Sequence, residues 1–97
     1  MSLRKTAAAG GFYPSDPDEL RALMDKLDEL LQSSDYSVPD QRPYALIVPH
    51  AGYIFSGFTA NAAYATIPED INDIVVIGPS HRVYIKGASI ADYDTYE

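Results

Sequence analysis

Residues 44–49, "YALIVP", and residues 73–78, "DIVVIG", are two nearly continuous apolar runs. Short runs of this kind are typical of strands that are buried on both faces of a parallel sheet. Between them, residues 58–67, "FTANAAYATI", place small and apolar side chains on one face, which predicts a helix that ends before Pro68. Strand, helix and strand form a βαβ unit, in which the two strands are parallel and the crossover is right-handed. The predicted fold class is therefore α/β.

Upstream of this unit the sequence predicts an amphipathic helix. Asp16 is its candidate N-cap, Pro17 occupies the first helical position, and Glu19 follows three residues after the cap. A single apolar face follows, made of Leu20, Leu23, Met24, Leu27, Leu30 and Leu31. We expect this face to pack on the sheet.

The remaining segments carry weaker signals. Residues 1–15 are predicted to be an irregular arm that ends in a turn, and residues 33–43 a surface connection. Residues 51–57, "AGYIFSG", are predicted to be a loop in which Ser56 caps the following helix. Residues 87–92, "GASIAD", are a candidate third strand.

Composition excludes several classes of function. The chain has 97 residues, which suits one small domain, and 46% of them are hydrophobic against 22% charged, as in a globular protein. A net charge of -7 gives no basic surface for nucleic acid. There are no cysteines, no apolar run of the roughly 20 residues that span a membrane, and no secretory signal. We expect a cytoplasmic protein without nucleic acid or membrane partners.

The only two histidines of the chain, His50 and His81, each follow one of the apolar runs. In open parallel sheets the ligand crevice lies outside the carboxyl ends of the strands, and neighbouring strands are about 4.8 Å apart. Two imidazoles at such ends can converge on one atom, as metal ligands or in acid–base chemistry. The alternative is that each histidine is structural. No third ligand is evident, because Asp92 and Asp94 lie in or after the weak third strand.

Two further chemistries are less favoured. The helix start after "GYIFSG" has backbone amides that could hold an anion, but the segment lacks the lysine of a phosphate-binding loop. Ser56 and Ser80 are hydroxyl nucleophiles by type, but no aspartate is placed to orient a histidine beside either of them. Serine hydrolysis is therefore strongly disfavoured. Tyr53 is the tyrosine that we expect to face the crevice.

Three motifs give the sequence a specific resemblance. In order, "AGGFYP" (9–14), "VPHAGYIFSG" (48–57) and "GPSH" (78–81) resemble the Memo family, also called AmmeMemoRadiSam system protein B. That family is similar in fold to the class III extradiol dioxygenases. The resemblance implies that this chain forms the N-terminal part of a mostly parallel central sheet flanked by helices.

The resemblance also implies a site. His50 and His81 would be metal ligands and catalytic residues, with Fe(II) as the first choice of metal and Cu or Zn as the others. Tyr53 and Ser80 would line the pocket, which would take a small molecule or a peptide. The implied function is metal-dependent redox or oxygenase-like chemistry. The alternatives are a non-catalytic adaptor for tyrosine- or phosphotyrosine-containing peptides in the same crevice, and an inert fragment.

Members of the family are longer than this chain, and their later half supplies the remaining site residues, including a third ligand that is a cysteine in some members. We therefore interpret residues 1–97 as a single partial domain, the N-terminal third to half of a longer Memo-like domain, with an incomplete site. The other interpretation is an oligomer that completes the open sheet edges.

Overall fold

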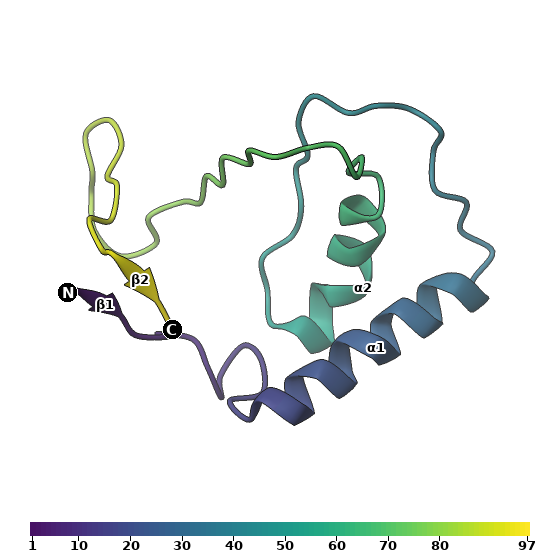
Figure 1. The fold of residues 1–97 in the computed structure, drawn as a ribbon, viewed down its shortest axis with the longest axis horizontal. Coiled ribbons are helices and arrows are strands. Elements are labelled where there is room, and N and C mark those ends of the chain that lie inside the picture. The colour runs from purple at the N-terminus through teal and green to yellow at the C-terminus, as the bar shows by residue number, and fades with distance from the viewer. The chain divides into compact units, whose positions relative to one another are not determined.

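The computed structural model describes all 97 residues and contains two helices and two short strands (Figure 1). In chain order they are β1 (Leu3–Arg4), α1 (Pro17–Ser33), α2 (Tyr53–Tyr64) and β2 (Thr95–Tyr96). The chain divides into two units, one formed by Met1–Ala7 and Ile71–Glu97, the other by Ala8–Asp70. The mixed α/β class is confirmed. Neither helix has the length and apolar character needed to cross a membrane.

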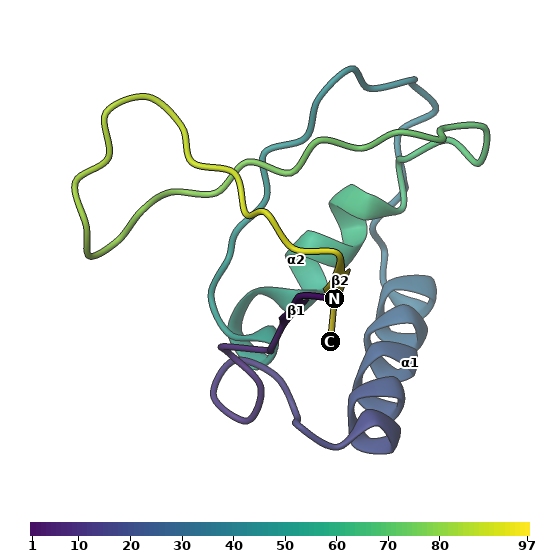
Figure 2. The ribbon, with the colours of Figure 1, turned by 60° about the vertical axis from the view of Figure 1, so that its left-hand side comes forward.

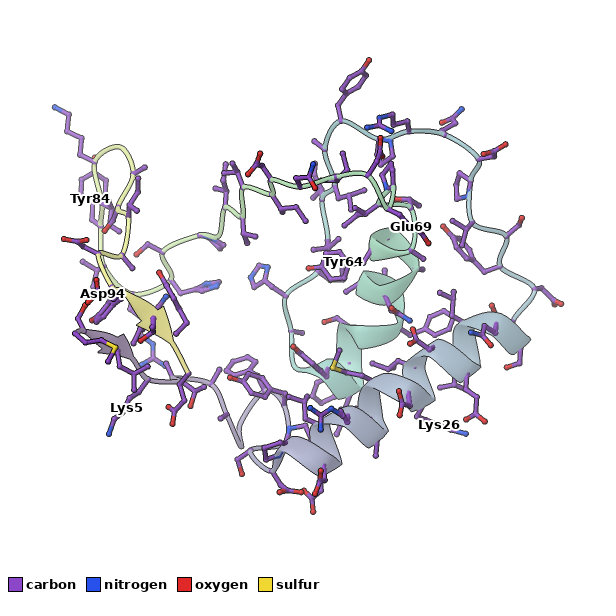
Figure 3. The ribbon with its side chains drawn as sticks, viewed as in Figure 1. Lys5, Lys26, Tyr64, Glu69, Tyr84 and Asp94 are labelled. Carbon is purple, nitrogen blue, oxygen red and sulfur yellow. The ribbon has the colours of Figure 1, made fainter.

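The predicted start of α1 is confirmed. Asp16 is the N-cap, with an extended backbone, and its Oδ2 accepts a hydrogen bond from the Glu19 N–H at 3.1 Å. Pro17 begins the helix, where the absence of an N–H leaves no backbone bond unmade. On the outer side of the helix, Lys26 Nζ lies 3.5 Å from a Glu29 carboxylate oxygen (Figure 3). This exposed pair contributes little to stability.

Helix α2 begins earlier and ends earlier than predicted. It starts at Tyr53, so most of the expected loop 51–57 is helical, and the N-cap is Gly52 rather than Ser56. The Ser56 hydroxyl instead donates to the Ala51 carbonyl at 3.1 Å, from within the first turn. The helix ends at Tyr64 and continues as a turn closed by the Ile67 N–H and the Tyr64 carbonyl.

The predicted packing of α1 on a sheet is wrong, because α1 packs on α2 (Figure 2). The two helices approach closely at Gly57, where a Cβ atom would lie 2.9 Å from Leu27 Cδ1. A glycine at this position lets the two helices meet with little side chain between them. The apolar face of α1 is only partly buried, since Met24 remains 51% exposed and Leu30 43% exposed.

The only strand pair joins segments that the sequence did not mark as strands. β1 and β2 are parallel, with Leu3 opposite Thr95 and Arg4 opposite Tyr96. Side chains extend the pairing, since the Ser2 N–H donates to Asp94 Oδ2 at 2.7 Å (Figure 3) and the Thr6 N–H donates to Glu97 Oε2 at 3.1 Å. These polar contacts hold the two ends of this unit together.

The predicted strands at 44–49, 73–78 and 87–92 do not form, and neither does the predicted βαβ unit. A helix makes its backbone bonds internally, whereas a strand needs a neighbour that supplies donors and acceptors. None of the three segments has such a neighbour. The prediction identified apolar character correctly and pairing incorrectly.

Removal of the α1 cap is expected to weaken the helix. Asp16→Ala deletes the side-chain acceptor for the Glu19 N–H, and loss of such a cap lowers the free energy of unfolding by about 1 kcal/mol. Asp25→Ala is the matched control, because it removes a carboxylate from the same helix without removing a cap. Urea denaturation followed by circular dichroism measures both, and equal effects would contradict the capping role.

Candidate functional site

Two of the three motifs meet at the N-terminus of α2. The first motif forms a tight turn over residues 8–13, in which the Gly10 N–H donates to the Tyr13 carbonyl at 2.7 Å. Gly10 has a φ of 84°, in the left-handed region that glycine adopts without a Cβ clash. The turn presents the carbonyl of Phe12 to the second motif.

The contact between the motifs is a backbone hydrogen bond reinforced by aromatic rings. The Tyr53 N–H, at the first position of α2, donates to the Phe12 carbonyl at 2.8 Å. The rings of Tyr13 and Tyr53 lie 5.4 Å apart between centroids, inclined at 38°. The backbones are close here, since a Cβ at Gly52 would lie 3.4 Å from the Phe12 carbonyl oxygen, at the near limit of ordinary van der Waals contact. The turn and the helix start therefore form one local structure.

A cavity of about 400 Å³ opens beside this junction. Its lining comes from the turn, the start of α1 and the start of α2: Gly10, Gly11, Phe12, Tyr13, Pro14, Glu19, Leu23, Gly52, Tyr53, Ile54 and Phe55. The lining is largely apolar and aromatic, and Glu19 is its one charged side chain. Such a surface suits a ligand with an apolar or aromatic body.

His50 lies in the same unit, between the apolar run and α2, and its side chain is exposed. Tyr53, three residues later, lines the cavity and is 36% exposed. The prediction that Tyr53 lines the ligand pocket of the histidine site stays a prediction.

His81 and Ser80 belong to the other unit and are also exposed. His81 begins a bend over residues 81–83, and Ser80 immediately before it donates from its hydroxyl to the Val83 carbonyl. The convergence of His50 and His81 on one atom, and a pocket role for Ser80, stay predictions.

The imidazoles of His50 and His81 are the candidate metal donors predicted from the sequence. Two imidazoles suit iron, copper and zinc, and both histidine side chains are reachable from solvent. No group of three or more His, Cys, Asp or Glu side chains in the chain could hold a metal ion. Asp94, considered above as a further ligand, accepts hydrogen bonds from Ser2.

An ion pair near the end of the Ala8–Asp70 unit is the main local electrostatic feature. Arg42 Nη1 donates to Asp70 Oδ1 at 3.0 Å and to Oδ2 at 3.2 Å. The hydrogen bond, and then the positive charge of the guanidinium, hold the pKa of Asp70 below its ordinary value of 3.8. The pair links the segment before the first apolar run to the segment after α2.

Arg42→Gln is expected to return the pKa of Asp70 to its ordinary value. Because the folded-state pKa is lowered, the stabilisation is present above the unfolded pKa and is lost as pH falls through the folded value. Carboxyl ¹³C chemical shifts measured against pH report the titration directly. Arg21→Gln, which removes an arginine from α1, serves as the control. An Asp70 titration that is the same in wild type and Arg42→Gln would refute the assignment.

The structure therefore defines a small mixed α/β chain in which two motif segments, "AGGFYP" and "HAGY", form one junction with a cavity beside it. The sequence profile of the family described as Memo-like protein matches residues 4–97. This chain belongs to the Memo family.

Relatives agree with this assignment. A MEMO1 family protein of Aquifex aeolicus is 40% identical over 97 residues, covering 100% of this chain and 34% of the relative. A MEMO1 family protein of Thermoplasma volcanium is 38% identical over 96 residues, covering 98% of this chain and 34% of the relative. The chain thus spans about a third of the length of the curated relatives it matches. No solved structure matches it.

Sequence reasoning missed the site role of the first motif. Phe12 and Tyr13 line the cavity and hold the start of α2, although the sequence placed them in an irregular arm. The signal that could have identified them was the occurrence of "AGGFYP" and "HAGY" in the same family resemblance, because motifs shared by a family often meet in the fold.

Proposed function

We propose that residues 1–97 are the N-terminal third to half of a longer Memo domain, in which His50 and His81 are two ligands of a non-haem metal ion. Fe(II) is the first choice of metal, with Cu or Zn as the others. The proposed fold of that whole domain is the one described for extradiol dioxygenases, a mostly parallel central sheet flanked by helices.

The observation that carries the proposal is the position of the two histidines. They are the only histidines of the chain, each immediately follows an apolar run, and both lie within the family match. Both side chains are exposed, so a donor from the rest of a Memo domain has access to them. Pro49 precedes His50 and Pro79 lies two residues before His81, which restricts the backbone that presents each imidazole.

The chemical roles follow from the side chains. Bound Fe(II) or Cu would supply redox or oxygenase-like chemistry, whereas Zn(II) has no redox chemistry of its own. His50 and His81 would hold it through neutral ring nitrogens, which requires both to be deprotonated at one nitrogen. Tyr53 and Ser80 would line the substrate pocket, and the junction of α2 with the first motif would fix the backbone on the His50 side. A small organic molecule is the proposed substrate class.

The experiment uses a chimera in which residues 1–97 replace the matched part of the Aquifex aeolicus relative. The purified chimera is analysed for iron, copper and zinc by mass spectrometry. We expect about one metal ion per chain, since a completed three-ligand shell retains its metal through purification. A folded chimera without stoichiometric metal would overturn the proposal.

The cavity favours a second candidate function, a binding module for tyrosine-containing peptides. Its aromatic lining, with Phe12, Tyr13, Tyr53 and Phe55, suits an aromatic side chain. The first-turn amides of α2 are largely engaged, because the Tyr53 N–H donates to the Phe12 carbonyl and the Phe55 and Ser56 N–H groups donate to the Gly52 carbonyl. The tyrosyl ring is therefore the part of such a peptide that the cavity would accept.

Titration with tyrosyl and phosphotyrosyl peptides tests this second function. Saturable binding to wild type, weakened at least about tenfold by Tyr53→Ala, is expected if the cavity holds the ring, since aromatic contacts at binding sites contribute above 1 kcal/mol. Tyr84→Ala is the control, because Tyr84 is 91% exposed and lies on the loop before β2. Equal binding by both variants, or no saturable binding, would eliminate the peptide-binding function.

A further inference from the structure

The net charge of the chain lies entirely on the unit that contains the cavity. Residues 8–70 carry ten acidic side chains against three basic ones, whereas residues 1–7 and 71–97 together carry four of each. Two of the three basic side chains in residues 8–70, Lys26 and Arg42, are already in ion pairs. The potential around this unit is therefore negative, and it acts on charged ligands over a Debye length of roughly 8 Å at physiological ionic strength.

Glu19 is the one charged side chain that lines the cavity, and its carboxylate has no partner in the chain. The Glu19 N–H donates to Asp16, but the carboxylate takes part in no hydrogen bond or ion pair. Glu19 is exposed, and no basic side chain lines the cavity. A carboxylate in this position can accept a hydrogen bond from an ammonium group, and such charge-assisted bonds are roughly twice as strong as neutral ones.

The aromatic lining provides a second interaction for the same kind of ligand. Phe12 and Phe55, which line the cavity with Tyr13 and Tyr53, are 55% and 87% exposed, so their rings are accessible to a ligand. The face of an aromatic ring is negative, and it attracts a cation that lies within about 6 Å of the ring centroid. An ammonium group on an aromatic or apolar body thus matches the carboxylate, the rings and the apolar lining together.

Two helix N-termini adjoin the cavity and by themselves favour an anion, but the carboxylates outweigh them. Each N-terminus is equivalent to about half a positive charge. The start of α1 carries three carboxylates, on Asp16, Asp18 and Glu19. At the start of α2 the Tyr53 N–H is already bonded to the Phe12 carbonyl. The charge balance at the cavity is therefore negative.

We propose that the cavity binds a small organic cation, a protonated amine carried on an aromatic or apolar body. Its volume of about 400 Å³ falls within the range of small-molecule sites, about 300–1,000 Å³. The ammonium group lies beside the Glu19 carboxylate, and the body lies against the aromatic lining. The inference rests on the cavity of the second candidate function, to which it adds the charge of the ligand, and it needs no metal.

Three probes of similar size separate charge from apolar contact: phenethylammonium, phenethyl alcohol and phenylacetate. Each is titrated into the 97-residue chain, and the amide chemical shifts of Gly11, Tyr53 and Ile54, which line the cavity, are followed by NMR. Phenethylammonium is expected to bind about five- to tenfold more tightly than the alcohol, because the carboxylate and the rings both attract its charge. Phenylacetate is expected to bind most weakly.

Glu19→Gln removes the charge and keeps the shape of the side chain. The preference for phenethylammonium over the alcohol is expected to fall about threefold, as for loss of an exposed ion pair, and the affinity for the alcohol to stay unchanged. Asp25→Asn is the matched control, because it removes a carboxylate from the same helix at a position that does not line the cavity. It is expected to keep the wild-type preference.

Equal affinity for phenethylammonium and phenethyl alcohol would overturn the inference and leave the cavity as a site for neutral aromatic groups. A preference lowered equally by Glu19→Gln and Asp25→Asn would overturn it too, since the carboxylate at the cavity would then have no special role. So would the absence of saturable phenethylammonium binding. The tyrosyl-peptide titration decides the second candidate function, and the metal content of the chimera decides the metal site, so each can fail alone.

Discussion

His50→Ala and His81→Ala are each expected to reduce the metal content of the chimera from about one ion per chain to near zero. In a shell of three protein ligands, losing one removes a third of the donors, and even outer partners of metal ligands change affinity by about 10- to 100-fold. The effect of a direct ligand should be larger. Mass spectrometric metal analysis of the purified variants measures it.

Two controls make this result interpretable. The isolated 97-residue chain is expected to bind the same metals weakly, because it has two imidazoles and no third donor grouped with them. Circular dichroism of each variant checks that α1 and α2 are retained. Equal metal content in the wild type and both histidine variants would contradict the proposed ligands, and tight stoichiometric binding by the isolated chain would contradict the need for an outside donor.

Gly57→Leu is expected to lower the free energy of unfolding of the helix pair by about 1–3 kcal/mol, the usual penalty for overpacking. Even a Cβ at this position would lie 2.9 Å from Leu27 Cδ1, and the rest of a leucine side chain has to displace α1. Gly57→Ala is expected to be close to neutral. Its one clash is with the end of a flexible side chain, and alanine gains about 1 kcal/mol in helix propensity over glycine.

Thr59→Leu is the matched control for this experiment. It introduces the same side chain into the same helix at an exposed position, so it changes helix propensity without forcing the helices apart. Urea denaturation of the three variants is compared with wild type. An equal free energy of unfolding for Gly57→Leu and Thr59→Leu would contradict the claim that the close packing of α1 on α2 excludes a large side chain at position 57.

The start of α1 was predictable because its determinants are local, whereas α2 begins five residues before the predicted position. Asp16, Pro17 and Glu19 specify the start of α1 within four residues of chain, and the structure has that start. The strands were not predictable to the same extent. The apolar pattern of residues 73–78 records a preference for burial, whereas a strand also needs a neighbour. The strand pair that does form joins Leu3–Arg4 to Thr95–Tyr96. It depends on polar contacts between residues far apart in the sequence, which no local pattern predicts.

For the candidate site, the sequence predicted only which residues to consider, from their positions along the chain. His50 and His81 stand out because the chain has no other histidines and each follows an apolar run. The cavity beside Tyr53 depends on the Phe12 carbonyl meeting the start of α2, a long-range backbone contact. Side-chain type alone gives no information about such a contact, and for that reason the first motif was taken for an irregular arm.

X-ray absorption at the metal edge of the chimera tests most directly whether His50 and His81 share one metal ion. The spectrum of wild type is expected to contain two imidazole ligands from this segment, with metal–nitrogen distances of about 2.0–2.1 Å if zinc is bound. One imidazole should disappear in any metal that His50→Ala or His81→Ala retains. A metal-loaded chimera whose spectrum contains no imidazole, or whose imidazole signal is unchanged in both variants, would contradict the account.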